Sequence, residues 1–199
     1  MNRLNHVAFI MDGNGRWGEK KGRGRNFGHL KGVEVVKKIV EISIKLKIPI
    51  LTFYVFSSEN WKRPKKEILY LFRLIKNYFD KEIHNIIKEK IKINIIGDKK
   101  KLPVDVKKTL KKTIKLTNNN DKIVVNLAIN YGSKNEILNT VKKLNRKKIT
   151  INEKNFTNNL LTKNIPNPEI LIRTGNTKRL SNFLLWQLAY TELFFEKKL

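Results

Sequence analysis

Short apolar runs alternate with stretches of helical periodicity along the whole chain, and this alternation restricts the fold more than any other feature. Runs of strand length occupy residues 6–11, 50–56, 91–96, 123–130, 169–172 and 192–195. Between them, apolar residues recur at helical spacing over residues 28–47, 63–79, 103–116, 133–144 and 156–161. The alternation predicts one α/β domain over residues 1–199, with a six-stranded, mainly parallel sheet flanked by helices. In such a sheet, functional residues gather at the carboxyl ends of the strands.

The composition narrows the class of protein. The 199 residues suffice for one sizeable core. No apolar run reaches the length of about 18 residues that a membrane span needs. The first residues form no basic-then-apolar leader, so we expect a cytoplasmic location. The chain has no cysteine, which excludes disulfides, thiolate metal sites and a cysteine nucleophile.

The formal net charge of +26 invites a nucleic-acid-binding interpretation. It comes from 34 Lys and only nine Arg, and the lysines are scattered along the chain rather than gathered with aromatic residues. We therefore favour a compositional bias acting on the surface, and we expect no nucleic-acid partner. The positive field would still attract diphosphates or anionic lipid headgroups.

The arginines are more informative than the total charge, because six of them fall in three short segments that each follow a predicted strand. These six are Arg16, Arg23, Arg25, Arg63, Arg173 and Arg179. Arginine offers a planar fork of donors for bidentate contact with phosphate, which lysine does not. Ion pairing with carboxylates is the alternative, but the chain has only 17 acidic residues. The distribution therefore favours oxyanion binding.

The first of these segments reads Met-Asp-Gly-Asn-Gly-Arg-Trp over residues 11–17. Its two glycines allow a sharp turn whose N–H groups face an anion. Asp12, beside that turn, suits Mg²⁺, which prefers a carboxylate together with substrate phosphate oxygens. An ordinary Asp-Gly turn with a solvated carboxylate is equally compatible with the residues. The segment is neither a Walker loop nor a dinucleotide fingerprint.

The second segment, residues 56–64, reads Phe-Ser-Ser-Glu-Asn-Trp-Lys-Arg-Pro. It holds two hydroxyls, an acid, an amide, an indole and a guanidinium, which is more than a connecting loop needs. A helix cap at Ser57 or Ser58, with Trp61 filling the core, would explain only part of this set.

The third segment carries Arg173 and Arg179 on either side of a glycine turn at a strand end. This spacing predicts a clamp for a second anionic group. Glu192 follows in a stretch that is poor in acids. His29 lies beside Gly28 near a predicted helix start, where it is either a capping or packing residue or part of the site.

Six blocks of sequence, in order from residue 6 to residue 195, resemble the cis-prenyltransferases, most closely the bacterial undecaprenyl diphosphate synthase (isoprenyl transferase) family. They read HVAFIMDGNGRW, RNFGHLKG, FYVFSSENWKRP, NIIGD, NLAINYG and IRTGNTKRLSNFLLWQLAYTELFF. The resemblance implies a Mg²⁺-dependent homodimer with a six-stranded parallel sheet and an apolar product tunnel. It also implies repeated addition of isopentenyl diphosphate to farnesyl diphosphate with cis geometry. In bacteria the product is the undecaprenyl carrier for cell-wall glycans, and we expect its delivery to the inner membrane surface.

The resemblance assigns a role to each matching residue. Asp12 and Glu192 would be the metal-site carboxylates, Asp12 would assist departure of the allylic diphosphate, and Asn60 matches the position assigned as proton acceptor. The residues implied for the allylic diphosphate site are Gly13, Asn14, Gly15, Arg16, Trp17, Arg25 and His29. The residues implied to contact substrate after the second strand are Ser57, Ser58, Glu59, Trp61 and Arg63. The residues implied for isopentenyl diphosphate are Arg173, Arg179, Leu180 and Ser181.

The chemistry of the residues agrees with this assignment. Two diphosphate substrates need two cationic clamps, and the two arginine groups supply them. The chain has five Asp and no two are adjacent, which excludes the aspartate-rich helical motifs of trans-prenyl synthases. A neutral amide is a poor base, so Asn60 either orients the substrate or passes a proton to released pyrophosphate. The apolar faces of residues 33–44, 50–56 and 68–79 form either the tunnel or ordinary core. Val55 stands where the family often has a smaller residue, which predicts a shorter product.

Three departures from the family pattern bear on activity. Asn176 and Thr177 stand where Gly and Glu are usual, which removes an acid near the isopentenyl clamp, and Glu169 replaces the usual Asp. Relatives continue beyond the position of Leu199, so we expect weaker dimerisation or weaker closure of the site. Two other functions stay open at this point. One is a catalytically weak binding subunit of a heteromeric complex, against which Asp12 and the clamp arginines argue. The other is a basic nucleic-acid-binding domain, favoured only by the charge.

Overall fold

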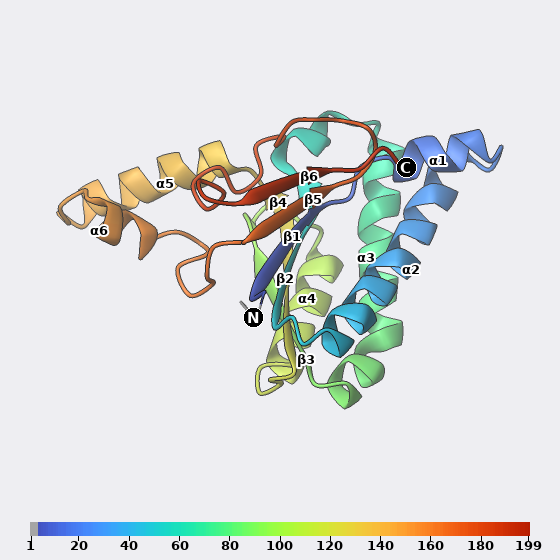
Figure 1. The fold of residues 1–199 in the computed structure, drawn as a ribbon, viewed down its shortest axis with the longest axis horizontal. Coiled ribbons are helices and arrows are strands. Elements are labelled where there is room, and N and C mark those ends of the chain that lie inside the picture. The colour runs from blue at the N-terminus through green and yellow to red at the C-terminus, as the bar shows by residue number, and fades with distance from the viewer. Residues whose placement is uncertain (1–3) are drawn as a thin grey trace.

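The computed structural model describes residues 4–199, and its centre is a six-stranded sheet in the order β3-β4-β2-β1-β5-β6 (Figure 1). The strands are β1 (His6–Ile10), β2 (Ile50–Ser57), β3 (Ile91–Ile96), β4 (Ile123–Tyr131), β5 (Ile170–Arg173) and β6 (Glu192–Phe195). All neighbouring strands pair in parallel. The predicted α/β class and six-stranded, mainly parallel sheet are confirmed, and the sheet is parallel throughout.

Helices cover one face of the sheet, and an irregular segment, residues 180–189, covers the other. The helices are α1 (Asn14–Lys20), α2 (Gly24–Lys45), α3 (Lys65–Lys88), α4 (Val104–Leu116), α5 (Ser133–Arg146) and α6 (Glu153–Thr157), with a 3₁₀ helix η1 (Ser58–Lys62). On the face covered by α2, α3 and α4, Leu51 and Phe53 of β2 pack with Phe72 of α3. On the opposite face, Phe183 and Leu184 of the irregular segment pack against the strands. α5 and α6 project away from the sheet (Figure 1).

The strands form in segments rich in apolar, β-branched and aromatic residues, with a few polar residues such as Thr52 and Asn126 among them. Successive side chains of β2 alternate between the two faces, so Phe53 meets the helices while Tyr54 meets the irregular segment. Both faces of the central strands are buried, which explains why their sequences are mostly apolar. α3 starts directly after Pro64, whose missing N–H costs nothing at the entry to a helix.

Several element boundaries differ from the sequence prediction. The turn expected at residues 12–15 is shorter, because Asn14 and Gly15 already belong to α1, and α2 begins at Gly24 rather than at residue 28. The helix expected at residues 156–161 is wrong. α6 covers Glu153–Thr157 because the Asn152 side chain accepts a hydrogen bond from the Asn155 N–H at 2.8 Å and caps the helix start there. Residues 180–189 are rich in apolar side chains and form turns and bends.

The carboxyl ends of β1, β2, β4 and β5 meet at one edge of the sheet because these strands are parallel neighbours. The three arginine-bearing segments follow β1, β2 and β5 directly. The fold therefore gathers at one edge the segments that the sequence singled out. Within residues 4–199, no helix has the length and apolar character needed to cross a bilayer.

Candidate active site

Two glycine-containing turns pack closely against each other where β1 and β5 end side by side. Gly13 has φ 101° and Gly175 has φ 91°, a region of backbone conformation that favours glycine. A Cβ at Gly175 would lie 2.8 Å from the carbonyl carbon of Asp12, and a Cβ at Gly13 would lie 3.3 Å from the Gly175 Cα. The Thr174 hydroxyl donates to the Asp12 carbonyl oxygen at 2.7 Å. The absence of side chains at the two glycines lets the two loops approach this closely.

Asp12 lies between two guanidinium groups. Its Oδ2 accepts from Arg173 Nη2 at 2.9 Å, and its Oδ1 accepts from Arg16 Nη2 at 3.2 Å. Burial of the Asp12 carboxyl opposes its ionisation, but the hydrogen bond and charge of Arg173, followed by those of Arg16, outweigh burial and lower the pKa of Asp12 below its ordinary value. Asp12 is therefore ionised at neutral pH and suited to bind a cation.

Arg173 is the last residue of β5 and is only 3% exposed. Its Nη1 donates to the Ser181 Oγ at 2.8 Å and to the Arg179 carbonyl oxygen. Its Nε is buried and has no partner within the described part of the chain. The hydrogen bonding of this buried guanidinium is therefore incomplete, and an anion in the adjacent cavity could accept the remaining hydrogen bond.

A second cluster of cations surrounds Glu67 of α3, which the sequence interpretation missed. The Glu67 carboxylate accepts from Arg63 Nη1 at 3.0 Å and from Arg25 Nε at 3.3 Å, and His29 Nε2 lies 3.3 Å away. The side chain of Glu67 is only 11% exposed. The signal that could have revealed it is its spacing of four residues from Arg63 on one helix, in a chain with few acids.

The pKa values of Glu67 and His29 are both lowered, but for different reasons. Burial would raise the pKa of Glu67, but the hydrogen bond and charge of Arg25 and the charge of Arg63 lower it. Burial lowers the pKa of His29, and the hydrogen bond to Glu67 offsets this only in part. At neutral pH Glu67 is charged and His29 is neutral.

The loop after β2 is held by its own polar side chains. Asn60 Oδ1 accepts from the Ser57 N–H at 3.1 Å, and Glu59 Oε1 accepts from Asn182 Nδ2 at 2.8 Å. Trp61 Nε1 donates to Asn130 Oδ1 at 2.7 Å. Asn130 and Asn182 were not predicted as site residues, although Asn182 lies in the RLSN block. They tie η1 to the end of β4 and to the irregular segment.

Two adjoining cavities lie at this edge of the sheet. The smaller, about 60 Å³, is polar and is lined by Met11, Asp12, Gly13, Asn14, Gly15, Arg16, Arg25, His29 and Arg63. The larger, about 640 Å³, extends between the sheet and helices α2 and α3. Its polar end is lined by Asp12, Asn14, His29, Ser57, Glu59, Asn60, Arg63, Arg173, Arg179, Ser181 and Asn182. Its apolar part includes Val33, Val36, Val55, Leu71, Leu74, Ile75, Tyr78, Phe79, Leu127 and Ile129.

The structure thus brings most of the predicted site residues around these two cavities. Five of the predicted residues line neither cavity: Trp17, Trp61, Leu180, Ser58 and Glu192. Trp17 stacks on Phe27 with the ring centroids 5.7 Å apart, and Trp61 packs among aromatic residues of β2 and α3. Leu180 packs against the apolar cluster of the irregular segment, and Ser58 lies against Gly132.

Glu192 also lies away from the cavities. It is the first residue of β6 and pairs with Ile170, whereas Phe195 pairs with Arg173. At the rise of a β-strand, Glu192 is about 10 Å along the sheet from the level of Arg173. Within one chain, the position of Glu192 does not bring it to Asp12, and its role as a second metal carboxylate stays a prediction.

The residues at the smaller cavity fit Mg²⁺ bound together with a diphosphate. Within residues 4–199 there is no group of three or more acidic or histidine side chains that could hold a metal alone. Mg²⁺ needs only one or two protein carboxylates, because substrate phosphates and waters complete its octahedral shell. Asp12 is ionised and 32% exposed at the cavity wall, and Arg16 and Arg25 flank the space for a diphosphate.

Comparison with known proteins identifies relatives over almost the whole chain. Residues 10–199 match the family model described as "Putative undecaprenyl diphosphate synthase". An isoprenyl transferase from Prochlorococcus marinus subsp. pastoris is 47% identical over 196 residues, which covers 95% of this chain and 72% of the relative. An isoprenyl transferase from Bacillus cereus is 40% identical over 197 residues, covering 96% of this chain and 76% of the relative.

Solved structures agree. Lavandulyl diphosphate synthase from Lavandula x intermedia, crystallised with dimethylallyl diphosphate, superimposes with a TM-score of 0.94 at 33% identity, covering 99% of this chain and 88% of that one. A probable undecaprenyl diphosphate synthase from Campylobacter jejuni gives a TM-score of 0.84 at 36% identity with the same coverage.

Proposed function

The chain belongs to the undecaprenyl diphosphate synthase family of isoprenyl transferases, the cis-prenyltransferases, and from that membership we propose that it elongates farnesyl diphosphate with isopentenyl diphosphate. The product would be a long cis-polyprenyl diphosphate, of the undecaprenyl type that carries cell-wall glycans. The observation that carries the proposal is the junction of two cationic pockets at Asp12, one ending in Arg173 and the other in Arg25.

The two pockets suit the two substrates. In the condensation, the C–O bond of the allylic diphosphate breaks, the isopentenyl double bond attacks the allylic carbon, and a proton leaves the isopentenyl unit. The allylic diphosphate would occupy the smaller cavity, where Arg16 and Arg25 stabilise the charge that develops on the leaving oxygens. Isopentenyl diphosphate would bind Arg173, Arg179 and Ser181, which line the larger cavity next to Asp12.

Mg²⁺ is implied by the family and fits this site. Asp12 would hold it against the allylic diphosphate, where a bound divalent cation neutralises negative charge on the leaving group. The guanidinium groups of Arg173 and Arg16 keep Asp12 ionised and oriented in the absence of that ion.

We assign to Asn60 an orienting role. Its Oδ1 already accepts the Ser57 N–H, and a neutral amide is a poor base. Asn60 lines the larger cavity beside Arg173 and Arg179, and its NH₂ group, which has no partner within residues 4–199, is available to a substrate oxygen there. A proton from the isopentenyl unit would then pass to the departing pyrophosphate.

The apolar part of the larger cavity is the proposed tunnel for the growing chain. Val55 lines it together with Leu127 and Tyr78. Replacing Val55 with Ala would enlarge the cavity, so the products should lengthen by one or more isoprene units on reversed-phase thin-layer chromatography. Unchanged product lengths would argue against a length-limiting role for Val55.

A homodimer across the β6 edge completes the proposal. β6 is at the end of the sheet, so one row of its backbone groups is available for pairing. Tyr190 is 99% exposed, Phe194 53% and Leu193 42%, an apolar group that suits a subunit contact. The mass by light scattering should be twice that of the chain, and Phe194→Asp should lower it toward the monomer.

The decisive experiment supplies farnesyl diphosphate, radiolabelled isopentenyl diphosphate and Mg²⁺ to the purified protein. Label should enter a butanol-extractable polyprenyl product, and a chelator should abolish incorporation. No incorporation by a folded protein, together with tight RNA binding at physiological salt, would instead favour a nucleic-acid-binding domain.

A further inference from the structure

Helix α2 is apolar on two sides, and only one of them is explained by the core. Its inner side contributes Val33 and Val36 to the wall of the larger cavity and Val40 to the core. α2 is less amphipathic than α3, α4 or α5, because apolar residues also occupy its outer side. The outer side therefore needs a separate explanation.

The exposed apolar residues of α2 form one row. Val35 is 53% exposed, Ile42 is 54% exposed, and Leu46, the residue that ends the helix, is 65% exposed. The intervals of seven and four residues place all three on one face. Exposed apolar residues aligned in this way, rather than scattered singly, mark a surface that contacts an apolar partner.

A row of lysines runs alongside this apolar row. Lys31, Lys38 and Lys45 are seven residues apart, and each lies three or four positions from a member of the apolar row. Lys31 pairs with Glu34 at 2.8 Å, whereas Lys38 and Lys45 form no ion pair within residues 4–199. Glu41 is the other acid on this side, beyond the lysine row. The face thus combines apolar side chains with free ammonium groups.

We propose that the outer face of α2, defined by Val35, Ile42, Leu46, Lys38 and Lys45, docks on the surface of an anionic membrane. A helix that lies on a bilayer inserts its apolar residues among the headgroups while its lysines contact lipid phosphates. The free lysines distinguish this occupant from a purely apolar partner. The proposal rests on the proposed function, because docking through α2 would hold the wall of the product cavity next to the lipid that receives the polyprenyl chain.

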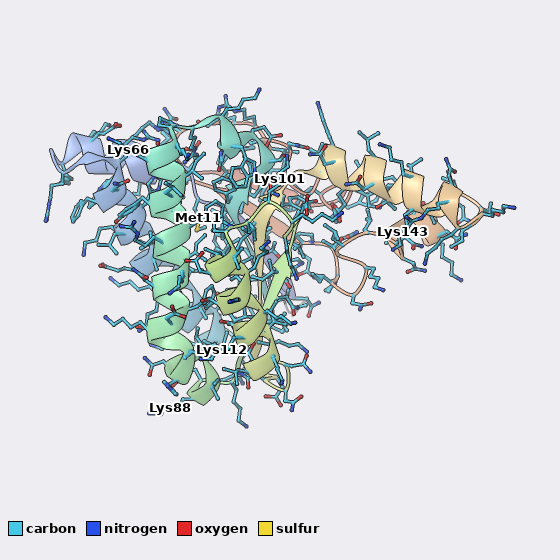
Figure 2. The ribbon with its side chains drawn as sticks, turned by 180° about the vertical axis from the view of Figure 1, so that it is seen from behind. Met11, Lys66, Lys88, Lys101, Lys112 and Lys143 are labelled. Carbon is cyan, nitrogen blue, oxygen red and sulfur yellow. The ribbon has the colours of Figure 1, made fainter. Side chains whose placement is uncertain are left out.

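The lysines elsewhere supply a matched control. Figure 2 shows that the basic side chains are spread over several elements, with Lys66 and Lys88 on α3, Lys112 on α4 and Lys143 on α5. A general attraction of the +26 charge to anionic lipid would depend little on which lysines are changed. Lys38→Glu/Lys45→Glu on α2 and Lys108→Glu/Lys112→Glu on α4 change the net charge equally, and all four side chains are exposed.

The test is sedimentation of the full chain with vesicles, without substrates or metal. The protein should bind vesicles that contain phosphatidylglycerol more tightly than vesicles of phosphatidylcholine alone. The α2 double reversal should weaken binding at least about tenfold, and the α4 reversal much less. Ile42→Ser/Leu46→Ser should also weaken binding about tenfold, whereas Leu138→Ser, at another exposed apolar residue on α5, should not.

Four results would overturn the proposal: no binding to anionic vesicles, equal binding to neutral vesicles, equal losses in the α2 and α4 reversals, or a change in molecular mass in Ile42→Ser/Leu46→Ser. The last would mean that the face joins two copies of the chain. Turnover assayed in detergent should be unchanged in the α2 variants, because none of the substituted residues lines either cavity. Failure of turnover in the unmodified protein would contradict the proposed function and leave the vesicle result standing.

Discussion

Two carboxylates at the site, Asp12 and Glu67, are surrounded by cations in different ways. Asp12 lies two residues after strand β1, contacts Arg173 and Arg16, and keeps 32% of its side chain exposed. Glu67 lies on a helix, contacts Arg25, Arg63 and His29, and is 11% exposed. Both have a lowered pKa, so both are charged at neutral pH.

Asp12 and Glu67 differ in whether a ligand can reach their carboxylate oxygens. Asp12 lines both cavities, and a metal ion or a substrate can reach it. Glu67 lines neither cavity, and its oxygens are taken by the cations that do. We infer that Asp12 takes part in the chemistry, whereas Glu67 positions Arg25, Arg63 and His29 around the diphosphate.

Replacing Asp12 should give the largest loss. Asp12→Ala removes the only carboxylate in the lining of the smaller cavity, and turnover should fall by at least about a thousandfold. The fold should persist, because Asp12 follows a strand rather than filling the core. Steady-state kinetics and circular dichroism measure the two effects. Asp98→Ala, at another strand end, is the control, and near-normal turnover in Asp12→Ala would refute the metal assignment.

The arginines of the isopentenyl clamp should differ from each other. Arg173→Lys replaces a buried planar fork that contacts Asp12 and Ser181, and the KM for isopentenyl diphosphate should rise about tenfold to a hundredfold. Arg179 is exposed, so Arg179→Lys should raise that KM only about threefold. In both variants the KM for the allylic substrate should change less. An equal rise for both substrates would mean that the clamp is shared.

Glu67→Gln tests the positioning role. It keeps the shape of the side chain but leaves Arg25 and Arg63 without their shared counter-charge, so kcat should fall about tenfold through misplacement. The affinity for the allylic diphosphate should not weaken, because the freed guanidinium groups remain available. Glu19→Gln, which removes a 51% exposed carboxylate beside the same Arg25, is the matched control and should be near wild type. A loss of affinity with unchanged kcat would contradict the positioning role.

The smallest expected effect is on the pH dependence of stability. Burial lowers the pKa of His29 below its ordinary 6.5, and burial does the same for His6 in the core. Just below 6.5 the unfolded chain therefore binds more protons than the folded chain, and the free energy of unfolding falls as the pH is lowered. Asp12 and Glu67 add to this loss only below their ordinary values of 3.8 and 4.5. The free energy of unfolding, measured by urea titration at several pH values, should change less steeply with pH near 6.5 in His29→Gln than in the wild type. The pH dependence that remains belongs to His6. An unchanged slope would show that His29 contributes nothing to it.

Much of the fold follows from local pattern. Residues 50–56 and 123–130 are mostly apolar because both faces of a central parallel strand are buried, so their assignment needs no tertiary information. The segments where a residue at the helix start decides the structure were harder to predict from the sequence. α1 begins after Gly13 and α6 after Asn152, and neither has the long apolar periodicity by which a helix is recognised.

The residues of the site likewise fall into those that the sequence could identify and those that it could not. The clamp arginines and Asp12 could be named from the sequence because they stand at strand ends in arginine-bearing segments, and parallel strands bring such ends together. Glu67 and Asn130 were not named, because the contacts that join them to the site include side chains far away in the chain, Arg25 for Glu67 and Trp61 for Asn130. Side chains such as Trp17 and Trp61 stand inside the same motifs, yet they pack on aromatic neighbours rather than on the cavity.

The order of apolar and polar residues along the chain determined the secondary structure and the parallel sheet, and it brought the three arginine segments to one edge, because hydrophobic burial depends on periodicity that is visible locally. The folded arrangement alone decided which charges neutralise one another and which remain free for a ligand. That outcome depends on distances and burial between residues far apart in the chain, and the energy of a charge pair changes with both.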